Sequence, residues 1–414
     1  MNTEKVLFWY MVALAIFSLI AWQIILIRGQ FFGIGYPYNT FLYYQPSHFG
    51  DFTCYDKIFI EFITTGEFKP GNSFSYFPVA ACGYIFFYYI SPFGAVYAYL
   101  LSVFSAVCIS GIILGYTLRR SPLAKMFWII IILTILTSYP FMFLIDRGNI
   151  EGLLWIFVLL GTLSFVNKKF FVAGACFAIA ASIKLYPVVF LLLLLSKHKY
   201  KEFVTSIFIL VAISILAAYG LTGSICETFN MIFSGQSGFL RTKVPVQEHI
   251  AVVGFIHSLY SVFYQILFIT QFAVNKFIIL IIYIISVSAG FVLLYIWKIR
   301  YLPLINQVFV LTISSILLPF VSVDYTLVHL YIPWGLFMIF LAYDAESTGF
   351  TTKQALNVLI PCAIIFTPQS YLIIEGIGGI GGQVKALTLL YLLIVVLKNP
   401  MPSDTLFKEN HSKA

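Results

Sequence analysis

One polar run, His48 to Asp56 (HFGDFTCYD), interrupts a chain that is otherwise mostly apolar. It lies in a polar segment, residues 28–75, that follows the first apolar stretch. A carboxylate such as Asp51 can take the proton of a hydroxyl group while that hydroxyl attacks an electrophilic carbon. If the chain is helical after Asp51, Tyr55 lies one turn further on the same face. Asp56 and Tyr76 would then add polar groups that bind a substrate. The alternative is an ordinary solvated loop acid.

A second polar cluster, Asp146 to Glu151 (DRGNIE), separates two later apolar stretches. Arg147, Asn149 and Glu151 could form a polar ledge for a sugar or a phosphate. A tight loop with an ion pair and a helix cap explains the same residues equally well.

Lys184 lies between apolar runs in AASIKLYP, residues 180–187. A charge within a membrane segment is costly unless it is paired or hydrated, and such residues are functional hypotheses by default. We expect a phosphate as the partner of Lys184, with Tyr186 beside it. The alternative is that Lys184 extends its ammonium group to the membrane surface.

Two further segments carry polar groups that could bind a substrate. Arg241, Lys243 and His249 follow a Gly- and Ser-rich stretch and could attract an anion, although a merely exposed basic loop is equally compatible. Asp324 and His329 lie in apolar surroundings, where each needs a polar partner. We expect them to line an outward cavity, with a structural Asp–His pair as the alternative.

The composition is that of a polytopic membrane protein. The 414 residues are 61% hydrophobic and 10% charged, whereas soluble domains have about 25% charged residues. We expect an all-α bundle with one transmembrane domain over residues 1–398 and a cytoplasmic tail over 399–414. The net charge of +8 is attributed to membrane topology, so no nucleic acid is expected as a partner. The six cysteines form no CxxC pair, so no metal site, disulfide framework or other cofactor is predicted.

The apolar segments predict about 12 spanning helices. They are expected near residues 6–27, 93–118, 126–145, 150–166, 170–183, 186–196, 202–221, 274–297, 304–320, 328–343, 354–372 and 384–398. Segments 76–90 and 251–272 are predicted to lie in the outer interface instead, because counting them as spans would put basic residues outside. With a cytoplasmic N-terminus, all the polar clusters fall on the outer side, which indicates a single site.

The order of the motifs resembles that of a known family. The shared elements are D-F-x-x-Y at Asp51, Y-x-P at Tyr76, R-G-N at Arg147, K-L-Y-P at Lys184 and the late loop with Asp324 and His329. The chain resembles the membrane glycosyltransferases of the C fold (GT-C), and most of all the polyprenyl-phosphate-mannose-dependent mannosyltransferases of glycosyltransferase family 87. It is also similar to the serotype-converting glucosyltransferases that decorate bacterial O-antigens.

This resemblance implies that Asp51 is the catalytic carboxylate and that Lys184 is the family's buried lysine. It implies transfer of a hexose, glucose or mannose, from a polyprenyl-phosphate-linked donor to a hydroxyl of a lipid-linked or cell-surface glycan, with inversion. Donor, acceptor glycan and membrane lipids would be the partners. The location would be the bacterial cytoplasmic (inner) membrane, with the site facing the periplasm or cell exterior.

Other classes of protein remain possible from the sequence. A lipid or glycan flippase without catalytic activity would also need Lys184 and Asp324 within the membrane. It predicts internal inverted repeats, which are not apparent, and it leaves the polar segment 28–75 without a role. A non-catalytic scaffold would tolerate Asp51→Ala. The chain contains no G-x-x-x-x-G-K-[ST], H-E-x-x-H or D-x-D motif, so nucleotide and zinc chemistry are not indicated.

Overall fold

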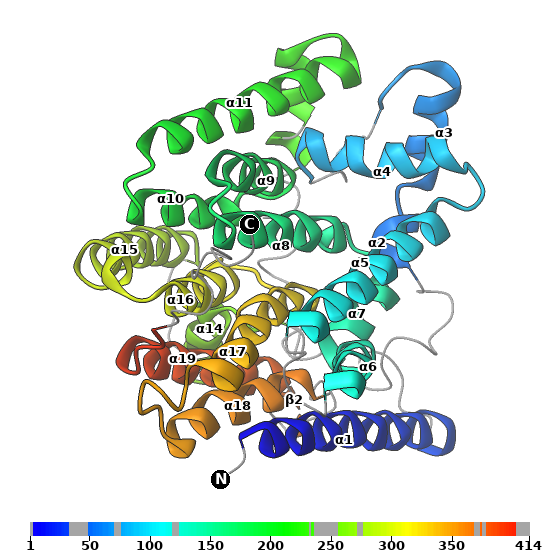
Figure 1. The fold of residues 1–414 in the computed structure, drawn as a ribbon. Coiled ribbons are helices and arrows are strands. Elements are labelled where there is room, and N and C mark those ends of the chain that lie inside the picture. Colours follow the sequence, from blue (N-terminus) through cyan, green and yellow to red (C-terminus); the bar gives the residue numbers. More distant parts are fainter. Residues whose placement is uncertain are drawn as a thin grey trace. The chain divides into compact units, whose positions relative to one another are not determined.

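The computed structural model describes residues 3–32, 49–69, 76–117, 124–231, 233–235, 256–270, 276–367, 373–374 and 378–402. Nearly all of these residues are helical (Figure 1). The chain divides into two compact units, each assembled from separate stretches of sequence. The first unit comprises Met1–Thr40, Val107–Met142 and Ile250–Ala414, and the second comprises Phe41–Ala106 and Phe143–His249.

The second unit contains most of the polar residues that the sequence singles out. Its elements are α2 (Gly50–Thr53), α3 (Asp56–Thr65), α4 (Pro78–Ile90), the first part of α5 (Ala95–Thr117), the end of α7 (Tyr139–Arg147), α8 (Glu151–Val166), α9 (Phe170–Ile183), the 3-10 helix η3 (Tyr186–Leu191), α10 (Leu192–Ser196) and α11 (Tyr200–Thr222). Helix α9 packs against α8, α11 and α4. It is therefore the central helix of this unit.

Small residues allow the close packing of α9. A Cβ atom at Gly161 of α8 would lie 2.5 Å from the ring of Phe177, and one at Gly174 of α9 would lie 2.1 Å from Oγ of Ser206 in α11. Glycine at such contacts lets helix backbones approach closely, which is how helices associate in lipid. These contacts fix α9, and with it Lys184, which directly follows the helix.

The first unit contains the remaining elements. They are α1 (Thr3–Phe32), the end of α5, α6 (Ala124–Thr137), the start of α7, α14 (Leu259–Ile269), α15 (Lys276–Trp297), the 3-10 helix η4 (Ile299–Tyr301), α16 (Leu304–Leu317), the 3-10 helix η5 (Asp324–Leu330), α17 (Tyr331–Tyr343), α18 (Thr352–Phe366), β1 (Ile373–Ile374), β2 (Gly378–Gly379) and α19 (Gly381–Lys398). Helix α19 packs against α16, α18 and α14, and α1 packs against α6 and α17. The two short strands pair antiparallel.

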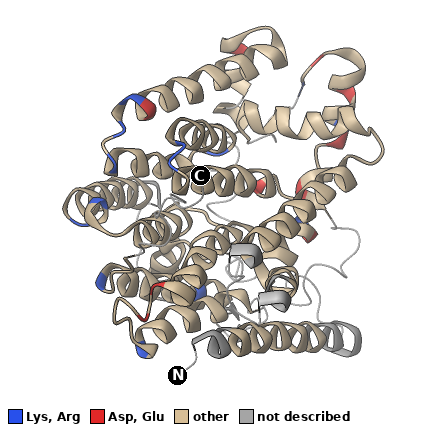
Figure 2. Ribbon diagram, viewed as in Figure 1, with Lys and Arg blue, Asp and Glu red and all other residues tan. Residues whose placement is uncertain are grey.

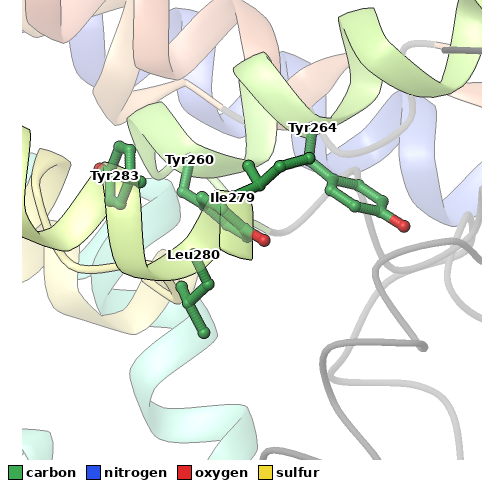
Figure 3. Packing of buried hydrophobic residues seen from close by; sticks show 5 residues of the cluster. All are labelled: Tyr260, Tyr264, Ile279, Leu280 and Tyr283. Atoms are coloured by element: carbon green, nitrogen blue, oxygen red, sulfur yellow. The ribbon is translucent and has the colours of Figure 1, made fainter. Parts of the chain in front are cut away.

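Tyrosines join α14 to α15 in the first unit. Figure 3 shows Tyr260 and Tyr264 of α14 beside Ile279, Leu280 and Tyr283 of α15. The Tyr260 and Tyr283 rings lie 5.1 Å apart, and the Tyr283 hydroxyl donates to the backbone carbonyl of Leu318 at 2.8 Å. This packing fixes α14, which lies within the segment 251–272 predicted to be interfacial. Its location at a membrane surface stays a prediction.

Within the described residues, each predicted span overlaps a helix or consecutive helices, and a nearly all-helical membrane protein is confirmed. Residues 118, 274–275 and 368–372 of the predicted spans lie outside the described residues. In the part of the chain that the structure describes, five helices are long and apolar enough to cross a membrane. A sixth span results if α6 and α7, which are bent by 59° at Ser138, count as one. Pro140 has no N–H to continue the hydrogen bonding of α6, which accounts for a break here. The number of about 12 spans and the single domain over 1–398 stay predictions.

Exposed apolar side chains indicate which helices face lipid. In the span Ile278–Tyr301, which contains most of α15, only 6% of the most apolar 18 residues are buried within the protein. In the span Asp324–Tyr343 the corresponding share is 89%. Such an extended apolar surface is rare on soluble proteins and suits the hydrocarbon of a membrane. Figure 2 shows that Lys, Arg, Asp and Glu occupy few positions along the described helices. Charges that are nevertheless buried therefore call for a structural or chemical explanation.

Candidate active site

Two hydrogen bonds from the end of α7 and the turn that follows it hold the Asp51 carboxylate, and a third fixes the backbone two residues before it. Its Oδ1 accepts a hydrogen bond from Arg147 Nη2 at 2.6 Å, and its Oδ2 accepts one from Asn149 Nδ2 at 2.8 Å. The backbone N–H of Phe49, just before α2, donates to the carbonyl of Asp146 at 2.6 Å. The Asp51 side chain is 20% exposed, so its position is fixed while water or a substrate can still reach it.

Gly148 makes this turn possible. Its φ is +61°, a left-handed conformation that is unfavourable for residues with a Cβ atom. A Cβ there would lie 3.0 Å from the Cβ of Phe52 and 3.2 Å from that of Phe49. The Gly148 N–H donates to the carbonyl of Leu144 at 3.0 Å and closes the end of α7. Glycine thus lets the two flanking residues, Arg147 and Asn149, address the same carboxylate.

The fully buried Asn149 links Asp51 to Lys184. Its Oδ1 accepts hydrogen bonds from Lys184 Nζ at 3.0 Å and from the Glu151 N–H at 3.1 Å. Its Nδ2 donates to Asp51 and also to the Tyr76 hydroxyl at 3.2 Å. An ammonium group only donates and a carboxylate only accepts. The amide therefore has one orientation that satisfies both neighbours.

Lys184 forms a buried ion pair with Glu151. Lys184 Nζ lies 2.6 Å from Glu151 Oε2, and the side chains are 18% and 0% exposed, respectively. Lys184 follows the last residue of α9 in an extended conformation, which turns it away from the helical path. Its ammonium also lies 5.8 Å from the centre of the Tyr76 ring. The apolar surroundings that suggested a functional lysine thus include a dedicated carboxylate partner.

Tyrosines surround these polar groups. The Tyr55 and Tyr76 rings meet edge to face at 5.9 Å, and Tyr76 and Tyr84 do so at 5.8 Å. The Tyr84 hydroxyl accepts a hydrogen bond from the Ile150 N–H at 3.1 Å, and the Tyr99 hydroxyl donates to the carbonyl of Asn149. Tyr84 and Tyr99 were not predicted as site residues, because nothing distinguishes them from other tyrosines of apolar helices.

Asp56 begins α3 and contacts α4, and its role in substrate binding stays a prediction. The chain is not helical from Asp51 through Tyr55, because α2 ends at Thr53 and α3 begins at Asp56. The Asp56 carboxylate accepts a hydrogen bond from the Tyr88 hydroxyl of α4. Burial raises the pKa of the Asp56 carboxyl above its usual value, and the bond from Tyr88 opposes this only in part. The observed contact of Asp56 joins α3 to α4.

The other predicted site residues lie elsewhere or outside the described residues. Tyr186 begins η3, two residues after Lys184. Arg241, Lys243 and His249 are not among the residues that the structure describes. Asp324 and His329 are buried in the first unit. The roles of all these residues in substrate binding stay predictions.

In the first unit, Asp324 is the centre of a second buried cluster. Its Oδ1 lies 3.0 Å from Nδ1 of His257, and its Oδ2 accepts from Lys385 Nζ and the Tyr139 hydroxyl. The side chains of Asp324, His257 and Lys385 are all fully buried. His257 and Lys385 were not predicted as site residues. Lys385 carried a usable signal, because it is a charge within the apolar segment of α19.

No metal-binding group of three or more His, Cys, Asp or Glu side chains occurs among the described residues. The absence of a dedicated metal site and of a cofactor stays a prediction from the sequence, and it makes no statement on metal dependence.

Comparison with known proteins identifies the family. The family model described as glycosyltransferase family 87 matches residues 74–322, which is more than half of the chain. Neither the curated proteins nor the solved structures contain a match to this chain. The matched range includes Tyr76, Arg147, Asn149, Glu151 and Lys184, whereas Asp51 precedes it. The chain is a membrane protein that belongs to glycosyltransferase family 87, and its enzymatic class is that of a glycosyltransferase.

Proposed function

We propose that this glycosyltransferase moves a hexose, glucose or mannose, from a polyprenyl-phosphate-linked donor to a hydroxyl of a lipid-linked or cell-surface glycan such as an O-antigen. The observation that carries the proposal is the linked group of Asp51, Arg147, Asn149, Glu151 and Lys184. It combines a partly exposed carboxylate with two cations. A transfer from a prenyl phosphate needs a base for the hydroxyl and positive charge for the phosphate, and the group supplies both.

In the proposed reaction, Asp51 is the general base. The acceptor hydroxyl oxygen forms a bond to the anomeric carbon of the donor, and its proton passes to the Asp51 carboxylate. The bond between the anomeric carbon and the phosphate oxygen breaks, and its electron pair leaves with the polyprenyl phosphate. Because attack and departure occur on opposite faces of the sugar, the configuration inverts. The hydrogen bond from Asn149 to Asp51 Oδ2 at 2.8 Å would keep the base in place during this step.

The leaving phosphate gains negative charge as the bond breaks. Cationic groups placed where this charge develops lower the barrier. Arg147 and Lys184 are the candidates within the described residues, and Arg241 and Lys243 are further candidates from the sequence. Since a neutralised phosphate is a good leaving group, this mechanism has no obligatory step for a metal ion.

We further propose a GT-C type of helix bundle in the bacterial inner membrane with the site on the outer, periplasmic side. The support is the shared side of the polar clusters under the positive-inside rule. On that side the enzyme meets lipid-linked donors and glycans and has no access to cytoplasmic nucleotide sugars. The family match favours a transferase over the flippase alternative.

Asp51→Asn tests the function directly. The amide keeps the shape of the side chain but does not accept a proton, so transfer should fall by about 10²–10⁴-fold. The assay follows a labelled hexose from short-chain prenyl-phosphate glucose and mannose to glycans extracted from the host, with the purified full chain in detergent. Mass spectrometry of the glycans of cells with and without the protein identifies the acceptor.

Glu67→Gln is the matched control, because Glu67 is an exposed acid of the same polar segment that pairs with the exposed Lys69. It should transfer at the wild-type rate. Activity of Asp51→Asn within threefold of wild type would exclude Asp51 as the base. Absence of any hexose difference between the two sets of cells would contradict the proposed reaction itself.

A further inference from the structure

The linked group around Asp51 holds no surplus positive charge. Asp51 pairs with Arg147 and Glu151 pairs with Lys184, so two acids and two bases cancel formally. The buried Asp146, next to Arg147 in the chain, contributes a further acid. A prenyl-phosphate sugar is a phosphodiester with one negative charge, and an anion removed from water needs a cationic or hydrogen-bonding partner. If a cation of this group binds the donor phosphate, that cation has to leave its present carboxylate, so one internal ion pair opens.

Burial decides which pair opens. Glu151 is 0% exposed, so removing Lys184 would leave a carboxylate in the interior without its cation. Breaking a buried pair in this way is strongly destabilising. Arg147 and Asp51 are 26% and 20% exposed, so both remain accessible to water or ligand when they separate. Asp51 would also keep its hydrogen bond from Asn149. The Asp51–Arg147 pair is therefore the one that opens at lower cost.

We propose that Arg147 exchanges Asp51 for the donor phosphate, while Lys184 remains bound to Glu151. The inference rests on the proposed function and assigns the phosphate ligand within it. The planar guanidinium group suits two phosphate oxygens at once. Its departure uncovers Oδ1 of Asp51 for the acceptor hydroxyl. Arg147 thus occupies Oδ1 of the base until a donor is bound, and the donor itself prepares the site for the acceptor.

The exchange predicts opposite effects of two substitutions on the binding of a sugar-free phosphodiester. The probe is farnesyl methyl phosphate, titrated calorimetrically into the full chain in detergent. Arg147→Gln removes the ligand and should weaken binding by about tenfold or more. Asp51→Asn removes the competitor for Arg147 and should tighten binding roughly three- to tenfold. A substitution that merely damages the site would weaken binding, so the tightening is diagnostic.

A double-mutant cycle separates exchange from simple repulsion between Asp51 and the phosphate. In exchange, Asp51→Asn acts by releasing Arg147, so it should have no effect in the Arg147→Gln background. In simple repulsion, the tightening persists there, and the proposal is overturned. Such a cycle isolates the interaction between the two residues. Glu67→Gln is the control for the loss of an acid and should leave binding unchanged.

The paired variant Lys184→Met with Glu151→Gln tests the fixed pair. It removes both charges together, so no unpaired charge is left behind, and probe binding should stay within about threefold of wild type. Loss of binding in this variant, with a wild-type elution profile in size-exclusion chromatography, would make Lys184 the phosphate ligand and overturn the proposal. If Arg147→Gln does not fold, Arg147→Lys keeps the charge without the planar fork. Arg147→Lys should weaken probe binding by a few fold, and adding Asp51→Asn to Arg147→Lys should still tighten binding.

Failure of the inference and failure of the proposed function give different results. If prenyl-phosphate hexose supports transfer that depends on Asp51, but the cycle shows no coupling, the exchange is wrong and the function stands. If the probe does not bind the wild-type chain and no prenyl-phosphate sugar supports transfer, both are wrong.

Discussion

The buried cluster around Asp324 makes a quantitative prediction about stability. The Asp324 carboxylate accepts hydrogen bonds from Lys385, His257 and the Tyr139 hydroxyl. The Lys385 ammonium also lies 4.7 Å from the centre of the Tyr139 ring. Because these side chains come from α7, α19, η5 and the residues before α14, one carboxylate joins four segments of the first unit. We expect this cluster to stabilise the fold, and the substitutions Asp324→Asn and Lys385→Met test that.

The two single substitutions should differ in cost. Asp324→Asn leaves the Lys385 ammonium buried without a counter-charge, and removing one partner of a buried pair costs about 3–5 kcal/mol. In Lys385→Met, the Asp324 carboxylate still accepts hydrogen bonds from His257 and Tyr139. The stability cost of this substitution should therefore lie at or below the lower end of that range. The double variant has neither charge. It should recover most of the loss, with a coupling free energy of about 2 kcal/mol or more.

The assay is the free energy of unfolding of the purified chain in mixed micelles with increasing denaturing detergent, measured for all four proteins. The exposed pair of Glu67 and Lys69 provides the matched control, and the same cycle there should show no coupling. Two single variants within about 1 kcal/mol of wild type would refute the stabilising role. So would a double variant whose loss equals the sum of the single losses. Loss of transfer by Asp324→Asn at unchanged stability would instead support the predicted role of Asp324 in lining a substrate cavity.

Three further predictions concern a glycine turn, a buried carboxyl group and the side of the membrane that two segments face. Gly148→Ala should lower the free energy of unfolding by about 1–3 kcal/mol and reduce transfer. Gly66→Ala should cost less, because Gly66 has a positive φ of 75° but an added Cβ would meet nothing within 4 Å. The thermal midpoints of both variants check this difference. Burial raises the pKa of Asp56, so its contribution to stability is present at low pH and lost as the pH rises through the raised value. The thermal midpoint of Asp56→Asn should therefore rise relative to wild type as the pH increases above the ordinary range of an aspartate carboxyl. A cysteine at position 67 in a cysteine-free chain should react with an impermeant maleimide on intact spheroplasts, and one at position 197 should not; the reverse pattern would invert the proposed topology.

The helices could be predicted because their signals are local. Apolar length defines each segment, and its ends are marked by residues with their own conformational preferences. Gly66 and Gly223 end α3 and α11 in left-handed conformations, Pro78 begins α4, and Pro187 is the second residue of η3. The predicted segment 170–183 coincides with α9, whose apolar run lies between Lys169 and Lys184.

The pairing of the charges could not be predicted in the same way. Asp51 and Arg147 are 96 positions apart, and their contact depends on how α2 packs against the turn after α7. Polarity alone left open whether Arg147 pairs with Asp146, with another acid or with a phosphate. Glu151 appeared as one more polar residue of a ledge, although the structure makes it the buried partner of Lys184. Such pairs are set by tertiary packing.

Lys385 escaped notice because of its place in the segment. It lies one residue after the expected start of the last span at 384, where a lysine usually reaches the membrane surface. In the structure α19 begins at Gly381, and Lys385 lies within the helix and is fully buried. The rule that drew attention to Lys184 applies equally to Lys385. The difference lay in the assumed start of the helix, because a start at 384 places Lys385 at the end of the span rather than inside it. Helix ends are the least certain part of a prediction from sequence.

The side chain at position 149 shows why this site needs an amide. Asn149 faces a carboxylate that only accepts and an ammonium group that only donates. Aspartate there would attract Lys184 but repel Asp51, and serine has a single oxygen and a shorter reach. An amide presents an acceptor on one side and two donors on the other within a planar group. Asn149 can therefore hold Asp51 whether or not Arg147 is present, and a base that stays fixed while its cation leaves is what a donor-dependent exchange requires.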